Sequence, residues 1–375
     1  MCMQARYPSL IWNAFNQNRN TVNDNNHYKD LVDRVTHARR ARESLRIMGS
    51  GSKQFYGRSV SGTTIDMRDY RGIIAYEPTE LYITVRAGTP VREIETRLME
   101  QGQMLAFEPP HYGDGATIGG VVATGLSGPR RPYTGSVRDY VLGIKCLSGH
   151  GEILNFGGQV MKNVAGYDVA RLMTGALGTL GILLEITLKV WPRPEQELTL
   201  SGKMKFDQAI QSMNTWAGKP LSLSAACYDG ERLHIRLSGK SSAVAVAAKQ
   251  LPLQPDPAGA DFWEKLREQQ LDYFNDERPL WRLSVPTTTG KPDLSGEWLI
   301  DWGGAQRWLR SEDKPAVIFS EAKKQGGHAM LFRGGDRTED VFQPLPASLM
   351  QLHLNLKQKF DPDRIFNRGC LYRDI

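Results

Sequence analysis

The sequence predicts an α+β protein with two main parts, a glycine-rich domain over residues 27–195 and a smaller α+β cap domain over residues 196–340. Three observations support this prediction. Three glycine clusters, each joined to an apolar strand-like run, occur in the first part. Pro192 and Pro194 then mark a boundary. Beyond them, strand and helix patterns alternate as in a compact α+β unit, and a length of 375 residues is enough for both parts.

The N-terminal region divides at about residue 27. Residues 13–26 contain seven asparagines and few large apolar side chains, so we expect residues 1–26 to form a disordered extension. A helix is expected from His27 onward, because apolar residues then follow helical spacing.

The charge of the chain is concentrated near its start. Residues 1–60 hold ten Lys or Arg and four Asp or Glu, which accounts for the whole net charge of +6. A basic region of this kind would attract a phosphorylated ligand, with a solvated helix face as the alternative. The other 315 residues carry no net charge, which argues against nucleic acid as a partner. No apolar run is long enough to span a membrane, so we expect a cytoplasmic protein.

The first glycine cluster, GSGSK over residues 49–53, follows a predicted strand at residues 45–48. Glycine allows positive φ, and consecutive free N–H groups can bind an anion. This phosphate loop therefore predicts a phosphate contact, with an ordinary strand-to-loop turn as the alternative. Its spacing differs from that of a P-loop.

Two strands and a helix are expected next. The strands fall at residues 73–76 and 81–87. Thr89 is the expected N-cap of the helix, Pro90 its first residue and Gly102 its end.

The second and third glycine clusters consist mostly of small and apolar residues. Six glycines fall within residues 113–128, and residues 175–182 lead into a strand. Glycine among β-branched residues is typical of buried backbone that a ligand approaches closely, although tight loop packing is an alternative. Three such loops predict one long ligand, such as a dinucleotide. The predicted inward face of the strand is Ile182, Leu184, Ile186, Leu188 and Val190.

The cap domain is expected to contain most of a ferredoxin-like unit. Its strand–helix–strand–strand–helix pattern falls at residues 197–200, 206–216, 222–228, 233–237 and 243–251. A helix at 261–271 and strands at 280–285 and 298–302 extend it. The C-terminal segment, residues 341–375, is expected to be helical at 345–360 and to return to the first domain.

Six segments together resemble a known family. They are GSGSK at 49–53, EPPHYGDGATIGGVVATGLSGPRRPYTGSVRDYVLG at 108–143, VMKNVAGYDVARLM at 160–173, GTLGI at 178–182, IDWGGAQRWL at 300–309 and FDPDRIFN at 360–367. Residues 27–195 resemble the FAD-binding domain of the vanillyl-alcohol oxidase type. Nearly the whole chain is similar to the smaller FAD-binding subunits of bacterial glycolate oxidases. The resemblance implies a two-subdomain FAD-binding domain of that type beneath the cap.

The resemblance also assigns roles to single residues. The phosphate loop would bind the pyrophosphate, the second cluster would lie along pyrophosphate and flavin, the third would hold the adenosine side, and Asn367 would approach the flavin ring. Relatives have proline after this asparagine, whereas this chain has Arg368, so the turn loses its preset φ. The phosphate loop has no His, Cys or Tyr before Tyr56, so we expect noncovalent FAD. The implied cofactor-binding residues are Gly49, Ser50, Gly51, Ser52, Lys53, Ala116, Thr117, Ile118, Gly119, Gly120, Ala123, Thr124, Gly125, Gly178, Thr179, Gly181, Ile182 and Asn367.

Oxidation of a 2-hydroxy acid requires a base, a cation for the carboxylate and a hydride path to the flavin. Related dehydrogenases use a histidine-rich metal site, but no two of the seven histidines here stand closer than ten positions. We therefore predict no metal site, and four widely separated cysteines predict no iron–sulfur cluster within this chain. His328 and Arg131 are the remaining catalytic candidates, each with a structural role as the alternative.

The resemblance implies an FAD-binding subunit of a complex that oxidises glycolate to glyoxylate. Its implied partners are a sister flavoprotein subunit and an iron–sulfur subunit that passes electrons to quinone. If the protein is located at the inner face of the membrane, we expect these partner subunits to hold it there. The alternative is a noncatalytic subunit that relays electrons through its flavin or supports the assembly, while the sister subunit binds the substrate. A stand-alone NAD(P)H reductase is a more remote alternative.

Overall fold

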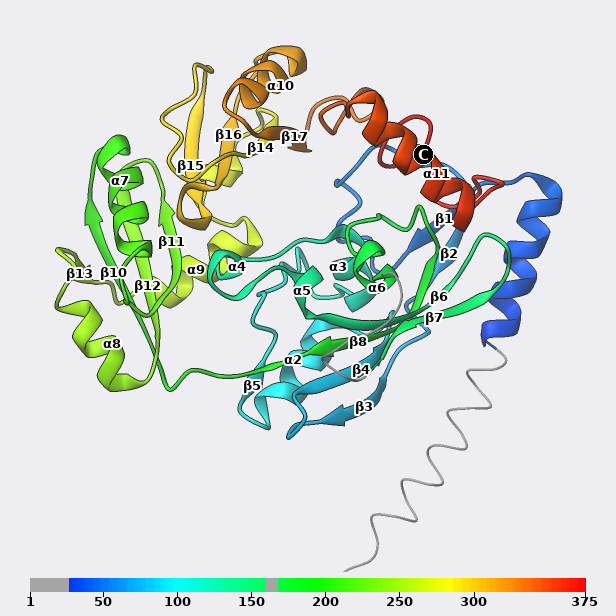
Figure 1. Cartoon of the computed structure of the whole chain (residues 1–375), viewed down its shortest axis with the longest axis horizontal. Helices are drawn as coiled ribbons and strands as arrows, with labels where there is room; N and C mark the ends of the chain where they lie inside the picture. Colours follow the sequence, from blue (N-terminus) through cyan, green and yellow to red (C-terminus); the bar gives the residue numbers. More distant parts are fainter. Residues whose placement is uncertain (1–26, 159–167) are drawn as a thin grey trace, which may run out of the picture.

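The computed structural model describes residues 27–158 and 168–375, which form two α+β parts (Figure 1). The first part is built on a five-stranded antiparallel sheet of order β3-β4-β8-β6-β7. The predicted inward face of β8 is fully buried, and the intervening Leu183 and Thr187 are nearly so, because both faces of the sheet are covered. The strands are β3 (Ile73–Glu77), β4 (Tyr82–Arg86), β6 (Val141–Leu147), β7 (Ile153–Gly157) and β8 (Ile182–Lys189).

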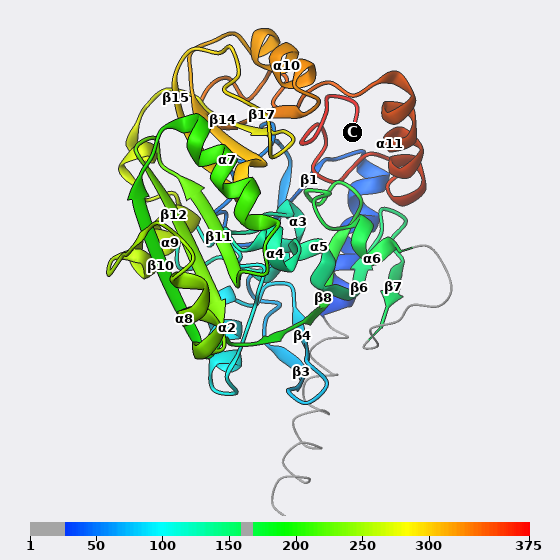
Figure 2. The same cartoon turned by 60° about the vertical axis from the view of Figure 1, so that its left-hand side comes forward.

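A smaller layer lies beside this sheet. Strands β1 (Leu45–Met48) and β2 (Thr63–Asp66) pair in parallel, and residues 27–41 are helical, with their apolar face packed against both strands. Helix α11 (Ala347–Phe360) lies near β1 in both views (Figures 1 and 2). The C-terminal segment therefore contacts the same layer as the start of the described chain.

Short elements connect these layers. The expected helix after residue 89 begins one residue late, because Pro90 is the N-cap. The hydroxyl of Thr89 instead accepts the N–H of Gly72 and donates to the carbonyl of Arg86. The connecting elements are α2 (Val91–Met99), α3 (Ile118–Thr124), α4 (Arg131–Thr134), α5 (Val137–Tyr140), α6 (Val169–Leu172), β5 (Gln103–Met104) and β9 (Trp191–Pro192).

The cap is one antiparallel sheet of order β13-β10-β12-β11-β15-β16-β14-β17. The predicted ferredoxin-like run is present as β10-α7-β11-β12-α8, but it supplies only part of this sheet. The strands are β10 (Gln196–Lys203), β11 (Leu223–Tyr228), β12 (Arg232–Gly239), β13 (Gln254–Pro255), β14 (Leu280–Ser284), β15 (Glu297–Asp301), β16 (Gln306–Arg310) and β17 (His328–Arg333). The helices are α7 (Phe206–Ala217), α8 (Ser241–Ala248), α9 (Gly259–Glu268) and α10 (Pro315–Lys324), with 3₁₀ turns at Asp272–Asn275 and Trp302–Gly304.

Strands β16 and β17 and helix α10 were not predicted. Arginines interrupt the apolar pattern of β16, yet all of its residues are buried. Arg307 and Arg310 donate there to backbone carbonyl oxygens, including those of Gly304 and Phe274, although Nε of Arg310 has no hydrogen-bond partner in the described residues. A strand that buries arginines against backbone carbonyls has no recognisable apolar alternation.

None of the described helices is long and apolar enough to cross a membrane. The expected extension at residues 1–26 and residues 159–167, which include much of the segment VMKNVAGYDVARLM, lie outside the described residues.

Candidate functional site

The three glycine clusters meet at one cleft of about 320 Å³ beside β1. The folded chain thus brings together segments from near both of its ends, with the C-terminal segment completing the wall. The predicted cofactor residues that line the cleft are Gly49, Ser50, Gly51, Ser52, Lys53, Thr117, Gly119, Gly120, Ala123, Thr124, Gly178, Gly181 and Asn367.

The phosphate loop presents unused donors at this cleft. Within the described part of the chain, the backbone N–H groups of Ser50, Gly51 and Lys53 have no acceptor. Gly51 has a φ of +79°, which glycine adopts without strain. Arg46, Lys53 and Arg58 add positive charge, and the described lining contains no Asp or Glu. Free N–H groups beside cations, without acids, are suited to a pyrophosphate.

Lys53 is a buried cation in the wall of the cleft. Its Nζ lies 3.0 Å from the carbonyl oxygen of His111 and 5.6 Å from the ring centre of Tyr112. Burial lowers the pKa of Lys53 to about 8, although the charge of Glu268 opposes this shift. Glu268 comes from the cap helix α9 and also accepts the N–H groups of His111 and Tyr112. The cap therefore contributes to the electrostatics of the phosphate loop.

Helix α3 starts at the cleft wall. Thr117 is its N-cap, and the hydroxyl accepts the N–H of Gly120. A Cβ at Gly120 would come close only to that hydroxyl, at 3.3 Å, so this glycine borders open space. At Gly181, a Cβ would lie 2.9 Å from the carbonyl oxygen of Leu147. Gly181 is therefore required for chain packing, whereas Gly120 leaves room in the cleft.

Asn367 holds two walls of the cleft together. Its side-chain oxygen accepts the N–H of Ile47, and its side-chain amide donates to the carbonyl of Leu177. Its own backbone N–H donates to Leu45. Asn367 keeps a left-handed φ of 39° although Arg368 follows it in place of proline. Because both ends of the amide are used by the chain, the geometry favours a positioning role for Asn367.

A buried ion pair fixes the segment before Asn367. Lys357 of α11 lies 2.8 Å from Asp361, with side chains 1% and 0% exposed. Lys357 also donates to the carbonyls of Thr179 and Phe366, and Asp361 accepts the N–H of Phe366. The pair therefore links α11, the third glycine cluster and the C-terminal segment.

Some predicted residues do not line the cleft, and some residues that line it were not predicted. Arg46, Tyr56, Arg58 and Cys370 belong to the second group, and only the basic N-terminal region gave a sequence signal for any of them. Burial raises the pKa of the Cys370 thiol to about 12, so it is a poor nucleophile at neutral pH. This fits a noncovalent cofactor. The predicted residues outside the lining, in the core or at the end of α3, are Ala116, Ile118, Gly125, Thr179 and Ile182.

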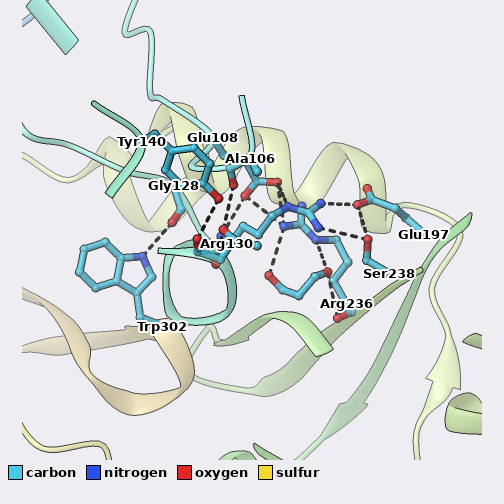
Figure 3. A network of polar contacts seen from close by, with 11 residues as sticks. Ala106, Glu108, Gly128, Arg130, Tyr140, Glu197, Arg236, Ser238 and Trp302 are labelled. Atoms are coloured by element: carbon cyan, nitrogen blue, oxygen red, sulfur yellow. Dashed lines mark hydrogen bonds and ion pairs between the residues drawn. The ribbon is translucent and has the colours of Figure 1, made fainter. Parts of the chain in front are cut away.

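A polar network joins the cap to the first part (Figure 3). The carboxylate of Glu108 lies 3.2 Å from Nε of Arg130 and 2.8 Å from Nη2 of Arg236. Arg130 also contacts Glu197 and Ser238 of the cap. Burial alone would raise the pKa of Glu108, but the charges of Arg236 and Arg130 hold it below its usual value. We call these five residues the junction clamp.

Neither of the two catalytic candidates lines the cleft. The guanidinium centre of Arg131 lies 4.3 Å from the ring centre of Trp302, whose Nε1 donates to the carbonyl of Gly128. His328 is the first residue of β17. Both side chains are exposed, and partial desolvation together with the charge of Arg282 lowers the pKa of each. In the described part of the chain, no group of three or more His, Cys, Asp or Glu could hold a metal ion.

Comparison with known proteins adds a family assignment. A family model described as an FAD binding domain matches residues 25–157. Glycolate oxidase subunit GlcE of Escherichia coli (strain K12) is 48% identical over 345 residues, which cover 92% of this chain and 97% of the relative. Glycolate oxidase subunit GlcD of Bacillus subtilis (strain 168) is 30% identical over 203 residues, 50% of this chain and 43% of the relative. A solved structure of alkyldihydroxyacetonephosphate synthase matches with a TM-score of 0.63 at 16% identity, over 90% of this chain and 74% of that one, and so shares the fold.

Proposed function

The chain belongs to the family of glycolate oxidase GlcE subunits, and we propose that it is the FAD-binding subunit of a complex that oxidises glycolate to glyoxylate. In this proposal FAD binds noncovalently in the cleft. In the same proposal, a sister flavoprotein subunit of the GlcD type completes the complex. An iron–sulfur subunit would carry the electrons on toward quinone, as the family resemblance implies.

The main support is the extent of the similarity. The 48% identity runs through 92% of the chain and so includes the cap as well as the FAD binding domain. The cleft supports the cofactor independently, because its free N–H groups and three cations, with no acid in the described lining, suit two linked phosphates.

FAD supplies the hydride acceptor for such an oxidation. Ser50, Gly51 and Lys53 would hold its pyrophosphate through backbone N–H groups, and the ammonium of Lys53 would offset its charge. Gly120 leaves space along α3, and Asn367 keeps β1 and the loop at Leu177 at a fixed separation. The described lining contains no Asp, Glu or His, so it offers no carboxylate or imidazole to accept the hydroxyl proton.

The proposal is tested by comparing the isolated chain with the assembled complex. The isolated chain, loaded with FAD, is expected to show little or no glycolate-dependent dye reduction. Activity should appear when the partner subunits are coexpressed. Rapid bleaching of the flavin by glycolate in the isolated chain would place substrate oxidation in this subunit instead.

The cofactor site has a separate test. Gly120→Trp is expected to remove most of the FAD while the circular dichroism spectrum is kept, because the side chain would fill cleft space. Gly290→Trp is the matched control, since a Cβ at Gly290 meets nothing within 4 Å and this glycine is exposed. Full FAD occupancy in Gly120→Trp would contradict the assigned cleft. Acid precipitation should release the flavin into the supernatant if binding is noncovalent.

A further inference from the structure

A short segment of the first part connects the cap to the phosphate loop. Glu268, the last residue of the cap helix α9, accepts the backbone N–H groups of His111 and Tyr112, at 3.1 and 2.8 Å. On the other side of the segment, Nζ of Lys53 donates to the carbonyl oxygen of His111 at 3.0 Å. A single peptide segment therefore joins an acid of the cap to a cation in the lining of the cofactor cleft.

The position of this segment depends on Glu268. Within residues 27–158 and 168–375, the N–H groups of His111 and Tyr112 have no other acceptor. Tyr112 has a φ of +51°, a left-handed conformation that is uncommon for a residue other than glycine. The side chain of Glu268 is only 10% exposed, so water has little access to replace its carboxylate as the acceptor.

The side chain of His111 ties the same segment to the first part. The imidazole is buried, and its Nε2 lies 3.2 Å from Oε2 of Glu95 on α2. Because the segment is held on both sides, the carbonyl oxygen of His111 has a defined position. That oxygen restricts the long, flexible side chain of Lys53, whose ammonium also lies 3.4 Å from the hydroxyl of Ser52.

Glu268 also acts on Lys53 through its charge. Burial lowers the pKa of Lys53 to about 8, and the negative charge of Glu268 works against that shift. The ammonium is therefore kept to a higher pH than burial alone would allow. Other charged groups on the surrounding elements are Arg46, Arg58, Glu95, Arg267 and Arg333, and Tyr112 is the adjacent titratable ring.

We propose that Glu268 is a positioning residue for the cofactor, through which the cap holds the ammonium of Lys53 at the cleft to offset the charge of the FAD pyrophosphate. A cation that is already held in place loses less conformational freedom when the ligand binds, so the affinity is higher. The inference rests on the part of the proposed function that places FAD in the cleft. It does not depend on glycolate oxidation or on the partner subunits.

The test measures the Kd of FAD for the full-length chain, by quenching of flavin fluorescence between pH 6 and pH 9. Glu268→Ala removes both the acceptor and the charge, and is expected to raise the Kd about tenfold at pH 7. Glu268→Gln keeps an acceptor oxygen and loses only the charge. Its affinity should be near normal at pH 6 and should begin to fall at a pH about half a unit lower than in the unmodified protein, because Lys53 then loses its proton earlier.

Glu264→Gln is the matched control, since Glu264 lies one turn earlier on α9 and is exposed. It should change neither the Kd nor its dependence on pH. A double variant then shows whether Glu268 acts through Lys53. In a Lys53→Met background, adding Glu268→Ala should change the Kd by less than about twofold, because the side chain that it positions is already absent.

Three results would overturn the proposal. The first is an equal rise in the Kd when Glu268→Ala is made with and without Lys53→Met, which would give Glu268 only a general role in holding the cap. The second is unchanged or tighter FAD binding in Glu268→Ala, which would mean that its charge merely repels the cofactor. The third is an unchanged pH dependence in Glu268→Gln, the variant that carries the test if Glu268→Ala does not fold.

The unmodified chain separates this proposal from the proposed function. If the unmodified chain binds no FAD, both are refuted. If it binds FAD and the Glu268 variants bind it equally well over the whole pH range, only the role of Glu268 is refuted. Failure of the assembled complex to oxidise glycolate would refute the proposed function and leave the role of Glu268 supported by the binding data.

Discussion

Arg130 and Arg236 share the buried carboxylate of Glu108, whereas Arg282 and Arg333, at the same junction, are covered by aromatic rings. The first pair belongs to the junction clamp and is complete within the chain (Figure 3). The second pair has no acid in the described residues. The buried arginines of the clamp depend on their acid, because removing one partner of a buried ion pair leaves the other charge uncompensated.

The largest expected effect comes from removing the central acid of the junction clamp. Glu108→Gln keeps the side-chain shape but leaves Arg130 and Arg236 buried without their shared countercharge. We expect a loss of about 3–5 kcal/mol in the free energy of unfolding. Urea denaturation measures it. Glu231→Ala, which breaks an exposed pair with Lys203, is the control and should change little. A small loss of unfolding free energy in Glu108→Gln would show that Arg130 and Arg236 do not depend on this acid, and so do not differ in this respect from Arg282 and Arg333.

A second prediction concerns Asp301, a buried acid near the clamp. Burial raises its pKa to about 7, and the charge of Glu108 adds to the shift. The folded state therefore holds this proton more tightly than the unfolded state, and stability should fall as pH rises from about 4 to 7. Asp301→Asn should remove this part of the pH dependence, on the order of 2 kcal/mol. Urea denaturation at pH 5 and pH 8 measures the free energy of unfolding of the unmodified protein and of Asp301→Asn. The same change with pH in both proteins would contradict the prediction.

Lys53 is intermediate between the arginines that contact an acid and those that do not. The charge of Glu268 raises its pKa, but the two side chains form no ion pair in the described residues. Its pKa of about 8 means that its charge is lost as pH rises through that value. FAD affinity should therefore fall by up to about tenfold between pH 7 and 9. Lys53→Arg, which stays charged, should keep the affinity constant over this range. Quenching of flavin fluorescence gives the Kd, and an equal fall in Lys53→Arg would assign the effect to another group.

The smallest effect is expected at Arg333, which lies over the ring of Phe55. Arg333→Met removes an unpaired cation and keeps an apolar contact with Phe55, so the free energy of unfolding should change by less than about 0.5 kcal/mol or rise slightly. Arg130→Met is the comparison and should cost several times more, because it leaves Glu108 with one partner fewer. Similar losses in the two variants would show that Arg333 has an undetected partner.

The cofactor cleft was largely predictable because its signals are local. A strand followed by GSGSK, and glycines set among small apolar residues, restrict the backbone over a few positions at a time. Most of the residues that the family resemblance assigned to these clusters line the cleft. Ile118 and Thr179 do not, because short helical and turn geometry directs every third or fourth residue into the core.

In the second half of the cap, β14 and β15 were predicted, but β16 was not. Strand β16 carries buried arginines whose partners are carbonyls of other segments, so its pattern resembles a polar loop. Asn367 is a similar case. The family resemblance indicated that it matters, but its partners Ile47 and Leu177 lie 320 and 190 positions away in the sequence.

Arg130 and Arg131 show where the limit lies. They are adjacent and chemically identical, and the sequence by itself determined only that two cations follow a glycine cluster. In the folded chain, Arg130 contacts Glu108 and Glu197, whereas Arg131 lies over the ring of Trp302. Glycine loops and strand patterns are properties of neighbouring residues, so the sequence determined the fold class and the cofactor cleft. The neutralisation of a charge depends on side chains that are distant in sequence, so only the tertiary structure decided which arginine is paired with buried carboxylates and which packs on an aromatic ring.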